Sequence, residues 1–132
     1  MKVLVSGGFD PVHSGHVMLL HSASQLGKVY VALNSDAWLI RKKGYKFMAW
    51  GERALILRQF ITVHGVIQVN DEDGTVVDAI VKLRPDYFVN GGDRNKSNPA
   101  EHEACLECGT KELFGIGGEK IASSSQLVEA VR

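Results

Sequence analysis

The chain has 132 residues, of which 45% are hydrophobic, and its fifteen Lys and Arg balance its fifteen Asp and Glu. This length suits one domain over residues 1–132, and the balanced charge excludes nucleic acid or an anionic membrane as the expected main partner. No signal-peptide pattern and no apolar stretch of membrane-spanning length occur in the sequence, so we expect a cytoplasmic protein.

Short runs of β-branched residues alternate with amphipathic stretches along the chain, which is the pattern of repeated β-α units and a parallel sheet. We predict strands at Lys2 to Ser6, Val29 to Leu33, Val66 to Val69, Tyr87 to Asn90 and Leu113 to Ile116. We predict helices at Gly15 to Leu26, Ser35 to Arg41, Glu52 to Thr62, Thr75 to Leu83, Pro99 to Cys108 and Ser124 to Val131.

The first predicted strand leads into Gly7-Gly8-Phe9-Asp10-Pro11-Val12-His13-Ser14-Gly15-His16, at the start of the first predicted helix. Ligands of an open parallel sheet bind at the carboxyl ends of its strands, and a helix N-terminus there presents N–H groups to anions. The two histidines flank Gly15, so both rings can face one anion, and the glycines let a ligand approach the backbone. The segment therefore predicts a site for a phosphate-bearing substrate.

These ten residues resemble the G-x-F-D-x-x-H-x-G-H signature of the cytidylyltransferase-like nucleotidyltransferases. That family transfers a nucleoside monophosphate from CTP or ATP to a phosphorylated acceptor. The resemblance implies a single α/β domain that is Rossmann-like and doubly wound, with a five-stranded, mainly parallel sheet, working with Mg²⁺ and forming a homodimer. It also implies that His13 and His16 hydrogen-bond the triphosphate and stabilise the transition state.

Other interpretations of this segment stay open. His13 and His16 could be ordinary polar residues at a helix start, or could form a metal site together with His21. Asp10 is expected to orient the loop, with magnesium binding as the alternative. Phe9 is expected to be part of the core or a wall beneath the nucleotide.

After the second predicted strand come Asn34-Ser35-Asp36-Ala37 and Arg41-Lys42-Lys43-Gly44, which resemble the family's second element, particularly in adenylyltransferases that activate heptose phosphates. The resemblance assigns the phosphate-binding lysine to Lys43, with its basic neighbours Lys42 and Lys46 as substitutes. A solvated basic loop would have the same composition. Asp36 and Lys46 are expected to meet the acceptor, although Asp36 could instead cap the short helix.

Glu52-Arg53 opens the third predicted helix and is similar to the family's E-R or Q-R element. The resemblance implies that Arg53 contacts a substrate phosphate, for which a planar guanidinium is suited. The alternative is a surface ion pair between the two residues, which would contribute little to stability.

The fourth predicted strand lies within Arg84-Pro85-Asp86-Tyr87-Phe88-Val89-Asn90-Gly91-Gly92-Asp93, which resembles the K-P-D-x-x-V-K-G-G-D run of the heptose-phosphate adenylyltransferases. Gly91 and Gly92 are expected to let the backbone lie close to the nucleotide, and Asp93 to fix the loop or contact the ligand. Asn90 stands where that subgroup usually has lysine.

Near the C-terminus, Ile121-Ala122-Ser123-Ser124-Ser125-Gln126 resembles the I-S-T-T or I-S-S-S element that precedes the family's last helix. Ser123, Ser124 and Ser125 are therefore expected to bind phosphate oxygens at a helix N-terminus. Ser123 and Gln126 also have the spacing of a capping box, a structural device that is compatible with this role.

The cysteines, Cys105 and Cys108, have C-x-x-C spacing with His102 three residues before the first. These residues could supply three zinc ligands, but no fourth ligand is evident, so a helix with two thiols is the favoured interpretation.

The motifs together predict a nucleotidyltransferase that acts by direct in-line attack of a sugar or polyol phosphate on ATP or CTP, with ATP slightly favoured. No G-x-G-x-x-G or G-x-x-x-x-G-K-[ST] motif is present, which argues against a dehydrogenase or a P-loop kinase. A nucleotide-binding module without turnover, acting as a sensor or partner subunit, is the alternative. The expected catalytic residues of the predicted transferase are His13, His16, Lys43 and Arg53. The expected nucleotide-binding residues are Gly7, Gly8, Phe9, Asp10, Gly15, Gly91, Gly92, Asp93, Ser123, Ser124 and Ser125.

Overall fold

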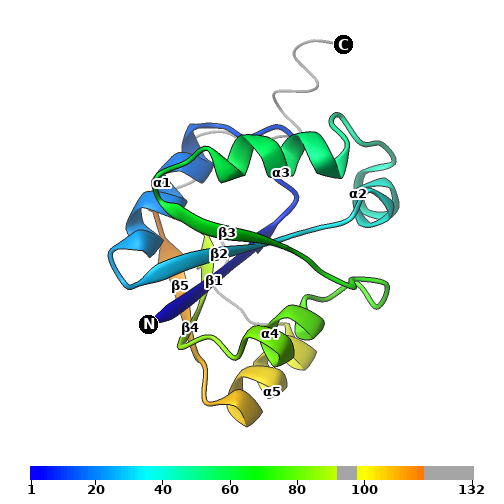
Figure 1. Cartoon of the computed structure of the whole chain (residues 1–132). Helices are drawn as coiled ribbons and strands as arrows, with labels where there is room; N and C mark the ends of the chain where they lie inside the picture. The colour runs from blue at the N-terminus through cyan, green and yellow to red at the C-terminus, as the bar shows by residue number, and fades with distance from the viewer. Residues whose placement is uncertain (92–97, 118–132) are drawn as a thin grey trace.

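The computed structural model describes residues 1–91 and 98–117 and shows a five-stranded sheet with helices on both faces (Figure 1). The strands are β1 (Lys2–Gly7), β2 (Lys28–Leu33), β3 (Val63–Gln68), β4 (Tyr87–Gly91) and β5 (Lys111–Ile116). The helices are α1 (Ser14–Ser24), α2 (Asp36–Lys43), α3 (Trp50–Arg58), α4 (Val77–Leu83) and α5 (Pro99–Cys108). Each predicted strand and helix within these ranges is present, the helix from Pro99 to Cys108 with the predicted ends and the others with shifted ends. The predicted helix from Ser124 to Val131 lies outside them.

The strands lie in the order β3-β2-β1-β4-β5, and every neighbouring pair is parallel. The chain passes outward from β1 to β3, then returns to place β4 on the other side of β1. This order confirms the predicted Rossmann-like, doubly wound α/β fold. The direction in which successive strands are added to the sheet reverses between β1 and β4. Ligands of such sheets bind at the carboxyl ends of the strands beside this switch point.

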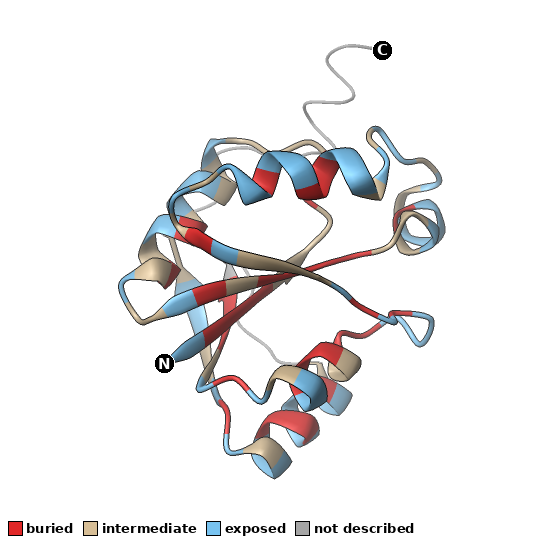
Figure 2. Ribbon diagram, in the orientation of Figure 1, coloured by how far each residue is buried: buried red, intermediate tan, exposed pale blue. Residues whose placement is uncertain are grey.

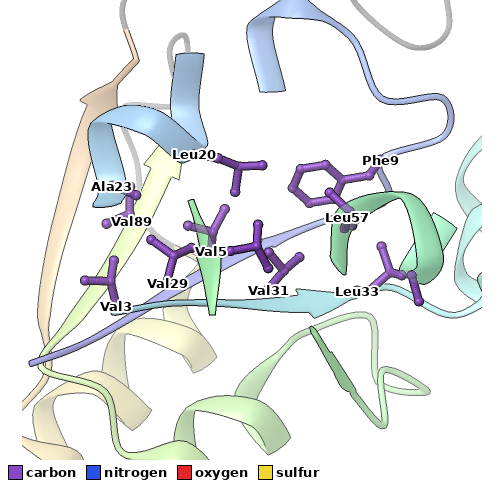
Figure 3. Packing of buried hydrophobic residues seen from close by; sticks show 12 residues of the cluster. Val3, Val5, Phe9, Leu20, Ala23, Val29, Val31, Leu33, Leu57 and Val89 are labelled. Atoms are coloured by element: carbon purple, nitrogen blue, oxygen red, sulfur yellow. The ribbon is translucent and has the colours of Figure 1, made fainter. Parts of the chain in front are cut away.

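The core lies on both faces of the sheet, because the central strand is buried on both sides. Val3 and Val5 of β1 pack with residues of α1 and α3, whereas Leu4 packs with residues of α4 and α5, and all three are fully buried. Figure 1 shows α1 and α3 over one face of the sheet and α4 and α5 over the other, and Figure 2 shows buried residues along the strands between them. Figure 3 shows the first of these layers, in which Leu20 and Leu57 converge on the valines of β1 and β2. Phe9 closes this layer beneath the loop that follows β1.

No helix within residues 1–91 and 98–117 combines the length and the apolar character that a bilayer span requires.

Candidate active site

His13 and His16 form the N-terminal cap of α1. The Nδ1 atom of His13 accepts a hydrogen bond from the Gly15 backbone N–H at 3.1 Å, and Nδ1 of His16 accepts one from the His13 backbone N–H at 3.2 Å. This is a reciprocal capping box built from two imidazoles. Because both Nδ1 atoms accept from the backbone, each neutral ring carries its proton on Nε2. The cap therefore fixes the donor atom of both rings.

The two imidazole rings stack on each other and rest on the core. Their centroids are 3.8 Å apart with an interplanar angle of 26°, and the Phe9 ring lies 4.5 Å from that of His16. Phe9 is 2% exposed and its φ is +50°, a conformation that costs an ordinary side chain about 1 kcal/mol or more. It serves as a buried support for His16, in agreement with the expected core or wall position.

Asp10 holds two loops together. Its buried carboxylate accepts hydrogen bonds from the backbone N–H groups of Phe47 and Met48, both at 2.6 Å. These bonds join the loop after β1 to the segment between α2 and α3. Both carboxylate oxygens therefore have backbone donors, which fits the expected loop-orienting role, while the magnesium-binding alternative stays a prediction.

We expect Asp10→Asn to lower the free energy of unfolding by about 1–3 kcal/mol, because the buried amide of the variant would offer one acceptor oxygen to the two backbone N–H donors. Urea unfolding with an unchanged m value would measure the loss. The matched control is Glu72→Gln, which neutralises an exposed carboxylate and should change stability by less than about 0.5 kcal/mol. Equal stability of the two variants would contradict the loop-holding role.

Arg53 lies inside the protein, with no exposed surface. Its Nη1 donates to the carbonyl oxygens of Gly8 at 2.8 Å and Asn34 at 2.9 Å, and its Nε donates to that of Met48 at 2.9 Å. Its Nη2 donates to Oδ1 of Asp36 at 2.7 Å. The guanidinium thus joins the ends of β1 and β2 to the start of α3.

The guanidinium of Arg53 has no exposed surface and is directed at three carbonyls and a carboxylate. Its contact with a substrate phosphate stays a prediction. The surface ion pair with Glu52 is wrong, because the acidic partner is Asp36 and the arginine is buried. Arg53 positions the loops of the site.

Asp36 and Lys46 lie beside Arg53, with Oδ2 of Asp36 at 3.2 Å from Nζ of Lys46. Partial burial raises the pKa of Asp36, but the hydrogen bonds and charges of Arg53 and Lys46 outweigh it and bring the pKa below its usual value. Asp36 is not the helix cap, because Ser35 occupies that position and its Oγ accepts from the Trp38 N–H. The contact of Asp36 and Lys46 with the acceptor stays a prediction.

The lowered pKa of Asp36 has a stability consequence with a definite sign. Its ionised form contributes stability above the ordinary carboxyl pKa of about 4, and the contribution is lost as the pH falls through the lower folded-state value. We therefore expect Asp36→Asn to be less stable than the parent at pH 7 and the gap to shrink below pH 4. Thermal unfolding at both pH values tests this, and a gap independent of pH would contradict it.

Asp71 is a site residue that the sequence analysis missed. From the loop after β3, its carboxylate accepts hydrogen bonds from Nδ2 of Asn34 at 3.0 Å, and from the backbone N–H and hydroxyl of Ser35 at 2.8 and 2.7 Å. Its carbonyl oxygen accepts from Arg41 at 2.9 Å. Asp71 therefore anchors the first turn of α2. The sequence signal that could have identified Asp71 is a carboxylate just after the third strand. Because β2 and β3 are parallel neighbours, the residues that follow β3 lie beside the polar residues that follow β2.

The candidate lysines occupy different places around α2. Lys43 is the last residue of the helix and is half-buried, and Gly44 ends the helix with a φ of +84°. The ammonium of Lys42 lies 4.6 Å from the centroid of the Trp38 ring, while Lys46 pairs with Asp36. The phosphate-binding role of Lys43 stays a prediction.

The second predicted nucleotide-binding element begins at the end of β4, on the other side of the switch point. Gly91 is the last residue of this strand, and the preceding Asn90 is buried, with its Nδ2 donating to the Leu113 carbonyl at 3.4 Å. Gly92 and Asp93 lie outside the described residues, as do Ser123, Ser124 and Ser125. Their assigned contacts stay predictions.

The residues of the zinc hypothesis have other partners. Cys105 is buried in the core layer between the sheet and helices α4 and α5, and Sγ of Cys108 lies 3.9 Å from the Ile80 carbonyl oxygen. Nδ1 of His102 lies 2.7 Å from Oε1 of Glu112. Over residues 1–91 and 98–117, no three His, Cys, Asp or Glu side chains are grouped so that they could hold a metal ion, and this also covers His13, His16 and His21.

Burial and the neighbouring acids raise the pKa of the Cys105 thiol to about 12. At pH 8 its thiolate fraction is about one in ten thousand, so we expect iodoacetamide to label Cys108 first and Cys105 only after unfolding. Mass spectrometry of the native and urea-treated protein locates each adduct. Rapid native labelling of Cys105 would contradict its place in the core.

Comparison with known proteins identifies related sequences. The family model described as cytidylyltransferase-like matches residues 4–114. The protein named "Bifunctional protein HldE" from Chromohalobacter salexigens is 36% identical over 132 residues, covering 98% of this chain and 27% of that protein. The protein of the same name from Syntrophotalea carbinolica is 44% identical over 94 residues, covering 69% and 19%. The matched part of the chain thus spans between about a fifth and about a quarter of the length of these curated relatives.

Two solved structures share the fold. The lipopolysaccharide core biosynthesis protein from Thermoplasma volcanium GSS1 matches with a TM-score of 0.71 at 20% identity, covering 86% of this chain and 93% of that one. A protein with unknown function from Archaeoglobus fulgidus matches with a TM-score of 0.60 at 18% identity, covering 91% and 99%. At these identities the likeness shows the fold alone.

Proposed function

The chain belongs to the cytidylyltransferase-like family, and from this premise we propose that it transfers a nucleoside monophosphate from ATP or CTP to a sugar or polyol phosphate. The observation that carries the proposal is the imidazole pair at the N-terminus of α1, beside the switch point of the sheet. His13 and His16 are held by the backbone as Nε2 donors, and the helix dipole adds positive potential at the same place.

The proposed reaction is a direct in-line displacement. A phosphate monoester is largely a dianion at neutral pH, so the acceptor oxygen attacks the α-phosphorus without a general base. The new P–O bond forms as the bond from the α-phosphorus to the bridging oxygen breaks, and pyrophosphate leaves. His13 and His16 donate to the oxygens that gain charge, and such preorganised donors act mainly in the transition state.

The other site residues have supporting roles in this proposal. Lys43 is assigned to the phosphates as a point charge. Arg53 acts from inside the protein by fixing the Gly8 carbonyl and the Asp36 carboxylate. Gly7 and Gly15 keep the backbone accessible to the triphosphate.

Magnesium is proposed to arrive with the nucleotide. The carboxylates of Asp10 and Asp36 already have backbone or cationic partners on both oxygens. Within residues 1–91 and 98–117 the side chains therefore do not form a magnesium cage.

Pyrophosphate release tests the proposal. The protein is incubated with ATP or CTP, Mg²⁺ and a panel of sugar and polyol phosphates, with the His13→Ala/His16→Ala double variant as the control. Acceptor-dependent release that the double variant lacks supports the enzyme. Saturable nucleotide binding without release from any acceptor supports the sensor or partner subunit.

We also propose that the protein forms a homodimer, as the family resemblance implies. Light scattering after size exclusion tests this by measuring the mass of the particle in solution.

Base choice is tested separately by thermal shift with ATP and CTP at the same Mg²⁺ concentration. A ligand that binds only the folded state raises its apparent stability. We favour ATP, and a buried hydrogen-bonding group left unpaired by the wrong base predicts a preference of at least about tenfold. Stabilisation by CTP alone would reverse the choice and leave the transferase proposal intact.

A further inference from the structure

One buried residue of the loop after β3 holds α2 at both of its ends. Asp71 is 3% exposed, and its carboxylate accepts the backbone N–H of Ser35 at 2.8 Å and the hydroxyl of Ser35 at 2.7 Å, just before the helix begins. In the last turn of α2, Nη2 of Arg41 donates to the backbone carbonyl of Asp71 at 2.9 Å. The start and the end of this eight-residue helix are therefore both fixed to Asp71.

The carboxylate of Asp71 also orders the N-terminal cap of α2. The Ser35 hydroxyl has one proton, which it donates to Oδ1 of Asp71. Its oxygen then has its lone pairs for the backbone N–H of Trp38, from which it accepts at 3.0 Å. If the carboxylate is lost, nothing directs the hydroxyl proton away from the helix, and the cap that begins α2 is weakened.

Asn34 connects Asp71 to the loop that carries the histidines. Its Nδ2 donates to Oδ2 of Asp71 at 3.0 Å, and both residues are buried. Its backbone N–H donates to the Gly7 carbonyl at 3.0 Å. Its own carbonyl accepts from Nη1 of Arg53, which also donates to the Gly8 carbonyl. A continuous series of hydrogen bonds therefore runs from α2 through Asp71 and Asn34 to Gly7 and Gly8.

We propose that Asp71 is a positioning residue that sets the distance between two triphosphate-binding elements, the imidazole pair at the start of α1 and Lys43 at the end of α2. This inference rests on the proposed transferase function, in which both elements meet one triphosphate. They follow different strands, so a displacement of α2 changes their separation, and a misplacement of about 1 Å can cost about 100-fold in rate. Asp71 acts through Lys43, because it holds the helix on which Lys43 lies.

A double-mutant cycle tests this role. We measure kcat/KM for pyrophosphate release, and the Kd of ATP and CTP with Mg²⁺, for the parent, Asp71→Asn, Lys43→Ala and the double variant. An amide has one acceptor oxygen for the three donors that the carboxylate serves. We therefore expect Asp71→Asn to lower kcat/KM about 100-fold and to raise the Kd about tenfold. In the Lys43→Ala background the same change should cost less than about twofold, because residues that act through one another are not additive.

Asp73→Asn is the matched control. Asp73 is an exposed carboxylate of the same loop, and its Oδ1 accepts from the backbone N–H and the hydroxyl of Thr75, within the loop itself. This variant weakens the loop without touching the bonds to α2, so kcat/KM and Kd should change less than about twofold. Ser35→Ala, which removes only the hydroxyl, provides the same cycle in a milder form if Asp71→Asn does not fold.

The outcomes separate this inference from the transferase proposal. The cycle on Kd needs only nucleotide binding, which the enzyme and the sensor alternative share. A loss in Asp71→Asn that is equally large with and without Lys43 would overturn the positioning role, as would parent-like kcat/KM and Kd in Asp71→Asn. Absent pyrophosphate release together with a coupled cycle on Kd counts against the transferase alone. A parent that binds neither ATP nor CTP overturns both.

Discussion

Replacing His16 by alanine is expected to lower kcat by about 100- to 1,000-fold while the Kd of the nucleotide changes little. The Nε2 donor of His16 is directed by the bond that Nδ1 accepts from the His13 backbone. A preorganised donor aimed at developing charge stabilises the transition state more than the ground state, so its removal appears mainly in turnover. Pyrophosphate release measures kcat, and titration with the nucleotide alone measures the Kd.

The capping role of His16 calls for a second variant. His16→Ala also removes an acceptor at the start of α1, which costs about 1 kcal/mol of stability. Glutamine is a usual residue at this position of a capping box, so His16→Gln should restore stability without restoring turnover. His21→Ala, at an exposed site of the same helix, is the control. Parent-like turnover in His16→Ala would show that the His16 imidazole takes no part in the mechanism.

The features that the sequence predicts well are encoded locally. The alternation of Val3, Leu4 and Val5 sets which side chains of β1 meet each layer of helices, because successive residues of a strand point to opposite faces. The imidazole pair is likewise local, since His13 and His16 lie on one helix turn. Strand and helix positions and the family motif therefore follow from short stretches of sequence.

The roles of Arg53 and Asp71 depend on contacts between distant segments. Arg53 stands next to Glu52 in the sequence, but its partners come from the ends of β1 and β2 and from the segment before α3. Asp71 crosses from the loop after β3 to the first turn of α2. Neither the spacing nor the composition of a segment shows which distant residues the sheet order brings together. The same local sequence around Arg53 is therefore compatible with an arginine that binds phosphate and with a buried arginine that holds loops together.

Replacing Arg53 by lysine is expected to lower the free energy of unfolding by about 3–5 kcal/mol and to leave kcat/KM far below that of the parent. Lysine keeps the charge but offers a single compact ammonium in place of a planar fork. It cannot serve the Gly8, Asn34 and Met48 carbonyls and the Asp36 carboxylate together. Carbonyl oxygens left without a donor, and an ammonium held inside the protein with too few partners, are the source of the expected loss.

Arg58→Lys provides the matched control for this prediction. Arg58 is an exposed residue of the same helix, 5.9 Å from the Trp50 ring centroid, and the variant should change stability by less than about 0.5 kcal/mol. Both variants replace an arginine of α3 by lysine and keep the positive charge. A difference between their unfolding free energies in urea, at an unchanged m value, therefore measures the contribution of the buried hydrogen-bond network of Arg53.

The pattern of losses also decides how Arg53 serves the site. A direct phosphate ligand would lose nucleotide affinity in Arg53→Lys while keeping its unfolding free energy. A clamp inside the protein loses stability first, and its activity falls because the loop at Gly8 and the carboxylate of Asp36 lose their common partner. Saturating nucleotide should then raise the melting temperature of the variant by mass action. If Arg53→Lys has the stability of the parent but a raised Kd for the nucleotide, Arg53 contacts a substrate phosphate directly.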